Sequence, residues 1–348
     1  MSRILYGLCS VGLGHAIRSR TILEHLSKKH ELFIVASGDS FAYLSNYFKN
    51  IHEIEGLQLA FRSNKTLTIK TILKNLKKIN PRTASRLKNV YKKIEEFNPD
   101  LVISDWEPFT SYTAKKLKLK LLSVDNQHYI MHGIYAYPKT QYLQKLKAQF
   151  ILKALTRKAD KYIIMALPKQ KLKYNKNIIK TRPVIRKTIL SAKPKKRNYI
   201  LVYQSTKTYS KLLSMLKTIP ENFIIYGYNI SKRDNNLVFR SFNDKRRFFN
   251  DLINCKAIIT NGGFTLISEA IHMKKPILAI PIKKHFEQYM NSLYIKKNNL
   301  GDFRKNLTKH NLRDFISRLE SYKTISTNQK NNYDFYQTLD KSIEELKK

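Results

Sequence analysis

The sequence IITNGGFTLISEA at residues 258–270, followed by KPILAIPIKKHFEQYMN at residues 275–291, is the most informative stretch of the chain. In it, an apolar run of strand length ends at Gly262 and Gly263, and a helical pattern starts directly after them. A second apolar run, Pro276–Ile280, ends in another polar turn. Short buried strands that alternate with helices are typical of βαβ units and a parallel sheet. The stretch therefore predicts an α/β domain with a glycine loop at a strand end.

The same alternation occurs in two series along the chain. The first series of apolar runs ends at Met165, and the second begins at Tyr199. Between them, residues 166–198 are basic, contain three prolines and have weaker periodicity. A length of 348 residues fits two domains. The predicted parts are an α/β domain at 1–190, a second α/β domain at 191–325 and a C-terminal helical segment at 326–348.

Composition and charge exclude several classes of protein. Apolar residues make up 42% of the chain, which is too many for a disordered basic protein, and no apolar run is long enough to span a bilayer. Lys and Arg number 66 against 25 Asp and Glu, a formal net charge of +41. No helix-turn-helix, zinc or RNA-recognition signature accompanies this charge, so we expect no specific nucleic-acid partner. Cys9 and Cys255 lie in apolar runs without metal spacing, which indicates buried thiols and a cytoplasmic protein.

A first glycine loop, Gly12-Leu13-Gly14-His15, follows the first predicted strand. Glycines at this place let the backbone approach a ligand, and the helix that follows presents free N–H groups. A dinucleotide fingerprint needs a third glycine near position 17, where the chain has Ile17; a tight turn without a ligand is the other alternative. His15 lies where open α/β sheets bind ligands, and histidine is suited to general-base chemistry.

Three acids follow later strands of the same predicted sheet. Asp105 and Glu107 lie in the sequence SDWEP at 104–108, and Asp125 begins DNQH at 125–128. The carboxyl ends of parallel strands share one edge, so these acids can approach His15. Capping of the following segment is the alternative for Asp105 and Asp125.

The second glycine loop predicts a nucleotide site. A helix that opens at Gly262-Gly263 can hold a diphosphate at its N-terminus. Glu269 lies further along that helix, where a carboxylate can accept ribose hydroxyls, and Glu287 and Gln288 follow the next strand. Carboxylates and amides match the alternating hydroxyls of a sugar.

These motifs resemble the GT-B glycosyltransferases, most closely the MurG-like branch and a neighbouring prokaryotic glycosyltransferase family. That pattern has a Gly-Gly turn, Thr, Glu, two spaced prolines, then Gln-x-x-Asn. The chain shows its members in the same order, as Gly262, Gly263, Thr265, Glu269, Pro276, Pro281, Gln288 and Asn291. The G-x-G-H motif and SDWEP match the neighbouring family as well.

The resemblance implies two Rossmann-like domains with parallel sheets facing a central cleft, the last helix packing back on the first domain. It implies a nucleotide-sugar donor, with UDP as the expected nucleotide, bound by the second domain. By position, Glu269 binds the ribose. The residues expected to bind the diphosphate are Gly262, Gly263 and Thr265, and those expected to bind the sugar are Glu287 and Gln288. Asn291 belongs to the same nucleotide-sugar-binding set. His15 and Asp105 are the catalytic candidates, with His15 acting as the base or positioning the acceptor. Gly12, Gly14, Glu107 and Asp125 are the acceptor-binding candidates.

Two absences indicate the type of reaction within this resemblance. The chain has no Asp-x-Asp motif, so we expect no metal and no cofactor besides the nucleotide-sugar co-substrate. Retaining GT-B enzymes carry an acid eight residues before the ribose-binding Glu, where this chain has Asn261. The pattern therefore favours inversion, by direct attack of an acceptor hydroxyl.

The distribution of charge suggests where the acceptor comes from. Residues 65–93 contain ten Lys or Arg and no acid, and Tyr129–Tyr137 place aromatics beside Lys139, Lys145 and Lys147. Tyrosine with lysine is typical of a surface that meets anionic lipid, although solvated lysines and core tyrosines are the plainer interpretation. We expect a lipid-linked or cell-envelope glycan acceptor, and peripheral attachment to the inner face of the cell membrane. A nucleotide-sugar epimerase and a noncatalytic polyanion- or sugar-binding protein remain alternatives.

Overall fold

The computed structural model describes residues 1–347 apart from 11, 57–59, 68–69, 72, 74, 76–79, 206–208, 243–244 and 328. The chain divides into two compact units. The first unit comprises Met1–Ala60, Thr68–Arg186 and Asn332–Lys348, and the second comprises Phe61–Leu67 and Lys187–Asn331.

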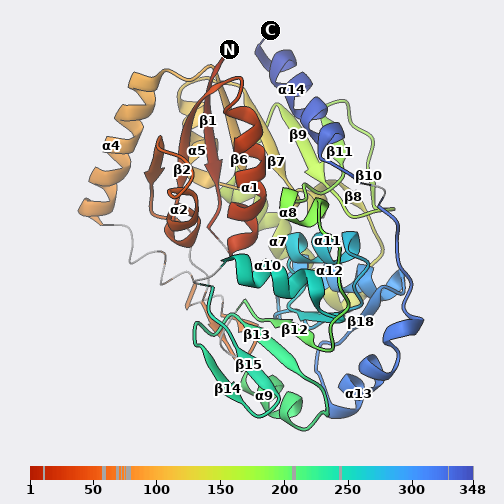
Figure 1. Ribbon diagram of the computed structural model, residues 1–348. Helices are drawn as coiled ribbons and strands as arrows, with labels where there is room; N and C mark the ends of the chain where they lie inside the picture. Colours follow the sequence, from red (N-terminus) through yellow and green to blue (C-terminus); the bar gives the residue numbers. More distant parts are fainter. Residues whose placement is uncertain are drawn as a thin grey trace. The chain divides into compact units, whose positions relative to one another are not determined.

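The first unit is built on a seven-stranded parallel sheet with the order β11-β9-β7-β6-β1-β2-β3 (Figure 1). The strands are β1 (Arg3–Leu8), β2 (Glu31–Ala36), β3 (Ile51–Glu53), β6 (Leu101–Asp105), β7 (Leu121–Asp125), β9 (Lys161–Met165) and β11 (Ile178–Thr181). The helices are α1 (Leu13–Leu26), α2 (Gly38–Leu44), α4 (Pro81–Phe97), α5 (Pro108–Lys116), α6 (Tyr129–His132), α7 (Tyr142–Leu155), α14 (Tyr333–Lys347) and the 3-10 turn η1 (Lys139–Gln141). β8 (Gly133–Ile134) and β10 (Lys171–Leu172) form a separate antiparallel pair.

Helices cover both faces of this sheet because successive strand residues point to opposite sides. Leu5 of β1 packs in a core cluster with Val90 and Ile94 of α4 and Ala114 of α5. Its neighbour Tyr6 hydrogen-bonds in the other direction, to Ser19 of α1. The sheet is therefore buried on both sides, which explains the nearly continuous apolar strands.

The second unit repeats the plan with the sheet order β14-β15-β13-β12-β16-β17-β18, parallel except for the β14–β15 pair. Its strands are β12 (Ile200–Tyr203), β13 (Phe223–Tyr226), β14 (Lys232–Asp234), β15 (Leu237–Phe239), β16 (Ala257–Thr260), β17 (Ile277–Ala279) and β18 (Gly301–Phe303). Its helices are α8 (Lys187–Leu190), α9 (Ser210–Lys217), α10 (Lys245–Asn254), α11 (Phe264–His272), α12 (Phe286–Lys297), α13 (Lys309–Ser317) and η2 (Leu319–Ser321).

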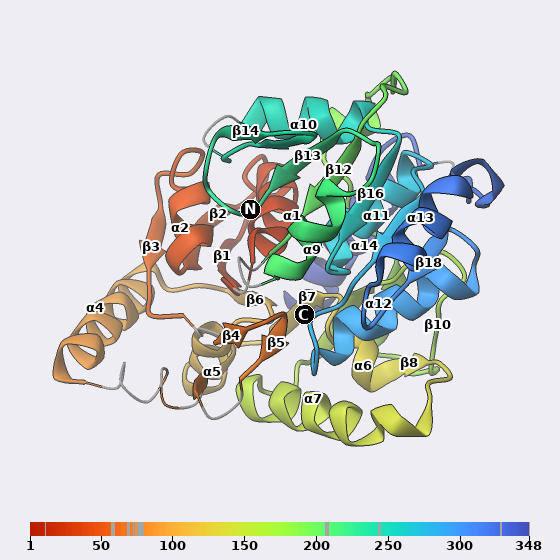
Figure 2. The same ribbon diagram turned by 90° about the horizontal axis from the view of Figure 1, so that it is seen from below.

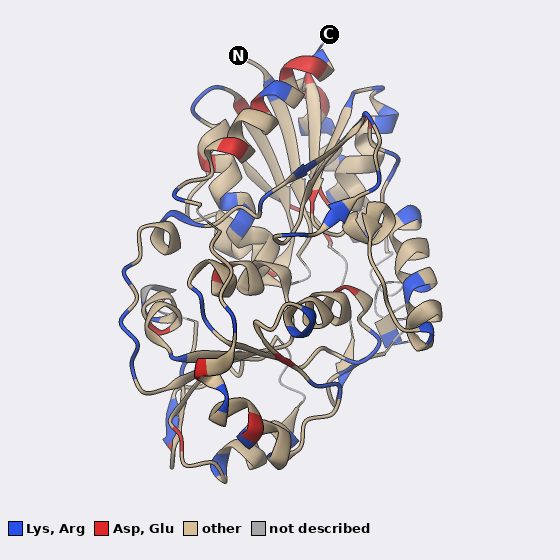
Figure 3. Cartoon of the chain, turned by 90° about the vertical axis from the view of Figure 1, so that its right-hand side faces the viewer, with Lys and Arg blue, Asp and Glu red and all other residues tan. Residues whose placement is uncertain are grey.

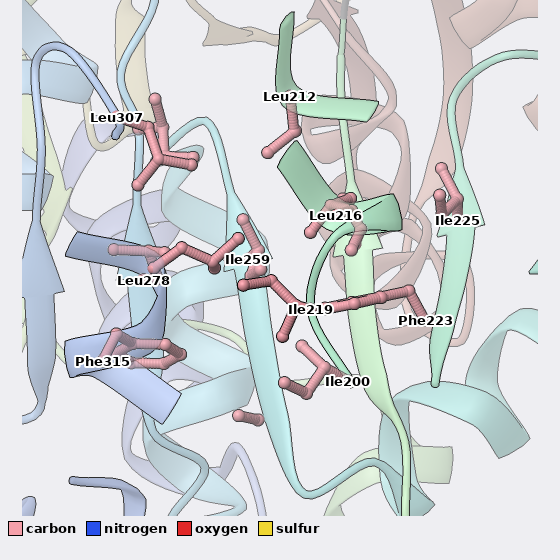
Figure 4. Close-up of a cluster of buried hydrophobic side chains, with 14 of the residues drawn as sticks. Ile200, Leu212, Leu216, Ile219, Phe223, Ile225, Ile259, Leu278, Leu307 and Phe315 are labelled. Atoms are coloured by element: carbon pink, nitrogen blue, oxygen red, sulfur yellow. The ribbon is translucent and has the colours of Figure 1, made fainter. Parts of the chain in front are cut away.

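The core of the second unit lies between its sheet and the helices α9 and α13. Leu212 and Leu216 of α9 meet Ile200 and Ile259 of the central strands, and Phe315 of α13 joins the same cluster (Figure 4). All five side chains are fully buried.

A short antiparallel hairpin, β4 (Phe61–Arg62) and β5 (Lys65–Thr66), belongs to the second unit although it lies within the predicted first domain. Its backbone is tied to the loop after β17: Lys283 N donates to Asn64 O at 2.8 Å, and Thr66 N donates to Lys283 O at 3.1 Å. This pairing links residues more than 200 positions apart, which periodicity along the chain cannot reveal.

The helix α14 packs on the sheet of the first unit against β6, β9 and β11. Asp340 of this helix accepts hydrogen bonds from His25 and Lys29, each at 2.8 Å. Among the described helices, none is both long and apolar enough to cross a membrane. Cys9 and Cys255 are buried and are not joined in a disulfide, as their apolar surroundings predict.

Candidate active site

His15 lies at the start of α1, directly after the first strand of the first unit. The helix starts at Leu13, so Gly14 and His15 are in its first turn and not in a loop before it. Gly12 is the N-cap residue with φ 85° and ψ 152°, a backbone conformation that glycine adopts without steric cost. The turn places His15 at the carboxyl end of β1.

Asp105 meets His15 because their strands are neighbours. β1 and β6 run parallel, with Leu8 opposite Asp105, so the two strands end at one edge of the sheet. His15 Nδ1 lies 3.0 Å from Asp105 Oδ1. Both side chains are buried, with 6% and 0% exposure. The two predicted catalytic residues therefore lie in direct contact.

Arg18 completes this cluster and was not among the predicted residues. Its Nε donates to Asp105 Oδ2 at 2.8 Å, and its two terminal nitrogens donate to Asp105 Oδ1 and to Asn126 Oδ1. Ser19 Oγ adds a hydrogen bond to Asp105 Oδ2 at 3.2 Å. Arg18 is only 3% exposed, so its charge is neutralised within the protein. Its i+3 spacing from His15 on α1 was the available sequence signal.

The hydrogen bonds around His15 select one tautomer of its neutral ring. Arg18 Nη2 donates its two protons to Asp105 Oδ1 and Gln127 Oε1, so it has none left for His15 Nδ1, 2.9 Å away. Since Gln127 Oε1 accepts from Arg18, the amide NH₂ of Gln127 faces the other way. The amide nitrogen of Gln127 lies 3.2 Å from Nε2 of His15, and this ring nitrogen accepts the hydrogen bond. The proton of the neutral ring is therefore on Nδ1 and is donated to Asp105, while the Nε2 lone pair accepts from the Gln127 amide, which a substrate hydroxyl would have to displace.

Charge pairing keeps the Asp105 carboxyl ionised. Burial alone would raise its pKa, but the Arg18 guanidinium and His15 favour the charged form and hold the pKa well below its usual range. An ionised Asp105 orients the His15 ring and can stabilise the imidazolium that forms when Nε2 takes a proton.

The other two predicted acids have different partners. Glu107 is the N-cap of α5 and accepts hydrogen bonds from Phe109 N at 2.9 Å and Thr110 N at 2.6 Å. Asp125 accepts from His128 N at 2.9 Å and lies 2.6 Å from His128 Nδ1, so it holds the turn before α6. Of the three acids, only Asp105 is in hydrogen-bond contact with His15.

The net pKa shifts of these two carboxyls have opposite directions, although burial acts to raise the pKa of both. It raises the pKa of Glu107 despite the hydrogen bonds from Thr110 and Phe109. For Asp125, pairing with His128 outweighs the cost of burial and lowers the pKa. Asp125 thus pairs with His128 in the turn before α6, whereas Asp105 pairs with α1, and the predicted role of Asp125 in acceptor binding stays a prediction.

Trp106 stands between Asp105 and Glu107 in a strained conformation. Its φ is 51°, unusual for a residue with a bulky side chain. The indole ring stacks on His15, with ring centroids 6.2 Å apart and an interplanar angle of 28°. Among the described residues, its buried Nε1–H has no hydrogen-bond partner. Strained residues of this kind are concentrated at functional sites.

In the second unit, Gly262 and Gly263 form the turn between β16 and α11. Gly262 has φ 90° and Gly263 is the N-cap of α11, with φ −66°. Thr265 and Glu269 lie on α11, where both side chains are buried, and the first turn of the helix follows Gly263. The turn therefore has the geometry of an anion-binding helix N-terminus.

Amide side chains of α12 hold the two loops of this site. Asn291 Nδ2 donates to Gly262 O at 3.1 Å, and Gln288 Oε1 accepts from Ile282 N at 3.0 Å. Glu287 lies beside them in the first turn of α12 and is half-buried. Gln288 thus positions the loop after β17, and Asn291 positions the loop after β16. That these two side chains contact a sugar stays a prediction.

Asn261 is a fully engaged amide at the position where retaining enzymes carry an acid. Its Oδ1 accepts from Ser205 N at 2.8 Å, and its Nδ2 donates to Gln204 Oε1 at 2.9 Å and Ile280 O at 3.2 Å. Asn261 therefore connects the ends of β12, β16 and β17, and it is 1% exposed.

Substitution of the two loop glycines is expected to have unequal effects. A Cβ at Gly262 would lie 2.8 Å from Ser292 Oγ and 2.9 Å from Gln288 O, whereas a Cβ at Gly263 would meet nothing within 4 Å. Gly262→Ala is therefore expected to lower the free energy of unfolding by about 1–3 kcal/mol. Gly263→Ala is the matched control and should stay within about 0.5 kcal/mol of wild type. Urea unfolding measures both; equal losses would show that the loop is not held as described.

Two parallel α/β units, with a His–Asp pair after the first strand and a glycine turn in the second unit, make up a GT-B glycosyltransferase. The chain belongs to Glycosyl transferase family 1, whose family model matches residues 2–320. It is a glycosyltransferase.

Solved structures of low sequence identity share the fold. The glycotransferase of kitacinnamycin is similar with a TM-score of 0.61 and 12% identity, over 92% of this chain and 91% of that one. A Polygonum tinctorium UDP-glucosyltransferase has a TM-score of 0.60 and 11% identity, over 91% and 89% of the two chains. Acinetobacter baumannii MurG has a TM-score of 0.54 and 13% identity, over 92% and 91%. No curated protein is significantly similar in sequence.

Proposed function

We propose that the protein transfers a sugar from a nucleotide-sugar to an acceptor hydroxyl, with inversion and without a metal ion. The observation that carries the proposal is the buried His15–Asp105 pair, in which the carboxylate accepts the Nδ1 proton. Nε2 then acts as the base once the acceptor hydroxyl replaces the Gln127 amide that it now accepts from. Nε2 takes the proton of the acceptor hydroxyl while its oxygen bonds to the anomeric carbon. The bond from that carbon to the diphosphate breaks, and the nucleoside diphosphate leaves with the electron pair.

The second unit supplies the donor site in this proposal. The diphosphate binds at the N-terminus of α11, where Gly262 and Gly263 let it approach the backbone, with Thr265 beside them. Glu269 binds the ribose hydroxyls. The sugar is bound by Glu287, Gln288 and Asn291. UDP is the nucleotide we propose; the similar Polygonum tinctorium enzyme is named as a UDP-glucosyltransferase.

A polar pocket in the first unit supports a glycan acceptor. It has a volume of about 540 Å³ and lies at the carboxyl ends of β1, β2 and β3, the sheet edge that also carries His15. Its lining is mostly charged or hydrogen-bonding, with Ser10, Ser37, Glu53, Glu55, Arg86 and Lys93 among its residues. Such a surface matches hydroxyl groups better than an apolar aglycone. Trp106 offers a ring on which a sugar can stack.

The acceptor that we propose is a lipid-linked or cell-envelope glycan, met at an anionic membrane. The predicted basic stretch at 65–93 is only partly described: Lys74, Lys77 and Lys78 lie outside the described residues. Lys and Arg residues are spread over the ribbon and greatly outnumber Asp and Glu (Figure 3).

A thermal-shift screen over UDP-, GDP-, CDP- and dTDP-sugars tests the donor site. A ligand at 100 times its Kd stabilises the native state by about 2.7 kcal/mol. We expect a UDP-sugar to raise Tm in wild type and a smaller rise in Gly262→Ala. The absence of a shift with every nucleotide-sugar would overturn the proposed donor site.

The product distinguishes transfer from epimerisation. The stabilising nucleotide-sugar is incubated with and without methyl glycosides as acceptor probes, in buffer that contains EDTA. Transfer with inverted anomeric configuration, read by NMR, supports the proposal. An epimerised donor formed without acceptor would show an epimerase, and strict dependence on added metal would contradict the metal-free step.

A further inference from the structure

The helix α7 exposes most of its large apolar side chains. Leu143 and Phe150 are 75% and 72% exposed, and Tyr142 and Leu146 are 52% and 42% exposed. Only Leu152 of this helix is buried. Figure 2 shows α7 as a long helix beside α6, the element on which it packs. Most of the apolar side chains of α7 therefore point away from the core of the first unit.

Three of the exposed apolar residues form one stripe with a lysine on each side. Leu143, Leu146 and Phe150 have the spacing i, i+3, i+7, which places them on one face of a helix. Lys147 follows Leu143 by four residues, and Lys153 follows Phe150 by three, so one lysine lies along each side of the stripe. Helices that lie in a membrane interface have an apolar stripe bordered by lysines.

The surroundings of α7 are cationic as well. The sequence from 126 to 159 contains six Lys or Arg and no Asp or Glu. Two of the six, Arg157 and Lys158, are exposed directly after the helix. Tyr112 of α5, 44% exposed, lies under Arg157 with the guanidinium 5.5 Å from its ring. The surface thus combines apolar insertion with a uniform positive charge.

We infer that α7 docks the protein on an anionic membrane, with Leu143, Leu146 and Phe150 in the interface and the flanking lysines on lipid headgroups. A second copy of the chain fits this face poorly, because a symmetric contact would bring like charges together. The helix α4, in the basic stretch singled out from the sequence, is exposed and charged, but none of its large apolar side chains is exposed. This inference rests on the proposed function, for it places the enzyme where a lipid-linked acceptor is found.

Co-sedimentation with vesicles tests the inference. Wild type is mixed with phosphatidylcholine vesicles that contain or lack phosphatidylglycerol, at low and high salt. We expect binding only to the anionic vesicles and only at low salt. Leu143→Ser/Phe150→Ser and Lys147→Glu/Lys153→Glu are each expected to weaken binding by about tenfold or more. Lys211→Glu/Lys309→Glu, with the same change of charge on exposed lysines of the second unit, should bind nearly as wild type.

Three results would overturn the inference. They are a wild-type protein that does not bind anionic vesicles at low salt, α7 variants that bind as tightly as wild type, and a wild-type dimer that Leu143→Ser/Phe150→Ser converts to a monomer in sedimentation velocity. The Tm rise with a UDP-sugar is measured on the same variants and should be unchanged. Its absence in every protein would refute the proposed donor and leave the vesicle result standing.

Discussion

His15→Ala is expected to reduce sugar transfer by about 10²–10⁴-fold, the usual contribution of a general base. The variant keeps the Arg18–Asp105 pair, because Arg18 holds both carboxylate oxygens through its own hydrogen bonds. The free energy of unfolding and the affinity for the nucleotide-sugar should therefore change little. The measurement is kcat with the stabilising nucleotide-sugar and methyl glycosides as acceptors, beside urea unfolding.

His310→Ala is the matched control, since this histidine is exposed on α13 in the other unit. Its turnover should equal that of wild type. Added imidazole should restore part of the activity of His15→Ala, which a purely structural role would not predict. Retention of more than about a tenth of wild-type turnover by His15→Ala would remove His15 from the chemical step.

Arg18→Leu is expected to have the largest effect on stability. The change leaves the Asp105 carboxylate buried without its main countercharge, and breaking a buried pair in this way costs about 3–5 kcal/mol. Transfer activity should fall as well, because Asp105 then loses the guanidinium that fixes it beside His15 and favours its ionised form. Urea unfolding at neutral pH measures the loss.

The stability lost in Arg18→Leu is expected to depend on pH in one direction. In wild type the pKa of Asp105 is lowered by folding, so its stabilisation is present above the unfolded value of about 3.9 and is lost as the pH falls through the lower folded value. Without Arg18, burial raises that pKa above the unfolded value. The stability difference between Arg18→Leu and wild type should therefore shrink on acidification.

Arg20→Leu provides the control on the same helix. Arg20 pairs at 2.6 Å with Glu24 near the surface, and a pair of this kind is worth about 0–1 kcal/mol. The double variant Arg18→Leu/Asp105→Asn should recover part of the lost stability because no charge stays unpaired. Equal effects of Arg18→Leu and Arg20→Leu would show that Asp105 does not depend on Arg18.

Long-range packing explains which strands escaped prediction. β6 and β16 are central and buried, so their apolar runs are visible in the sequence. β3, β11 and β18 have three or four residues each and contain polar or charged positions, so they lack a clear period. The first series of strands therefore extends past Met165 to β11, which pairs with β9. Edge strands of this length are specified by the neighbour they pair with.

The site was predictable where a strand end or a glycine marked it. His15 and Asp105 follow neighbouring strands, and parallel register brings such residues together without knowledge of any side chain. Arg18 looked like an ordinary helix-surface cation in a chain of net charge +41. Glu107, a predicted acceptor-binding residue, accepts hydrogen bonds from the backbone of α5, and its contact with an acceptor stays a prediction.

Local pattern was enough to establish two parallel α/β units, the glycine turns at Gly12 and Gly262, and the edge of the sheet that carries His15. These features follow from the order of apolar and turn residues along the chain. The pairing of Arg18 with Asp105, the hold of Asn291 on Gly262, and the exposure of α7 required the folded chain. Each of these features depends on which residues, distant in sequence, pack against one another and which side chains remain exposed. The local periodicity of the sequence does not encode this packing.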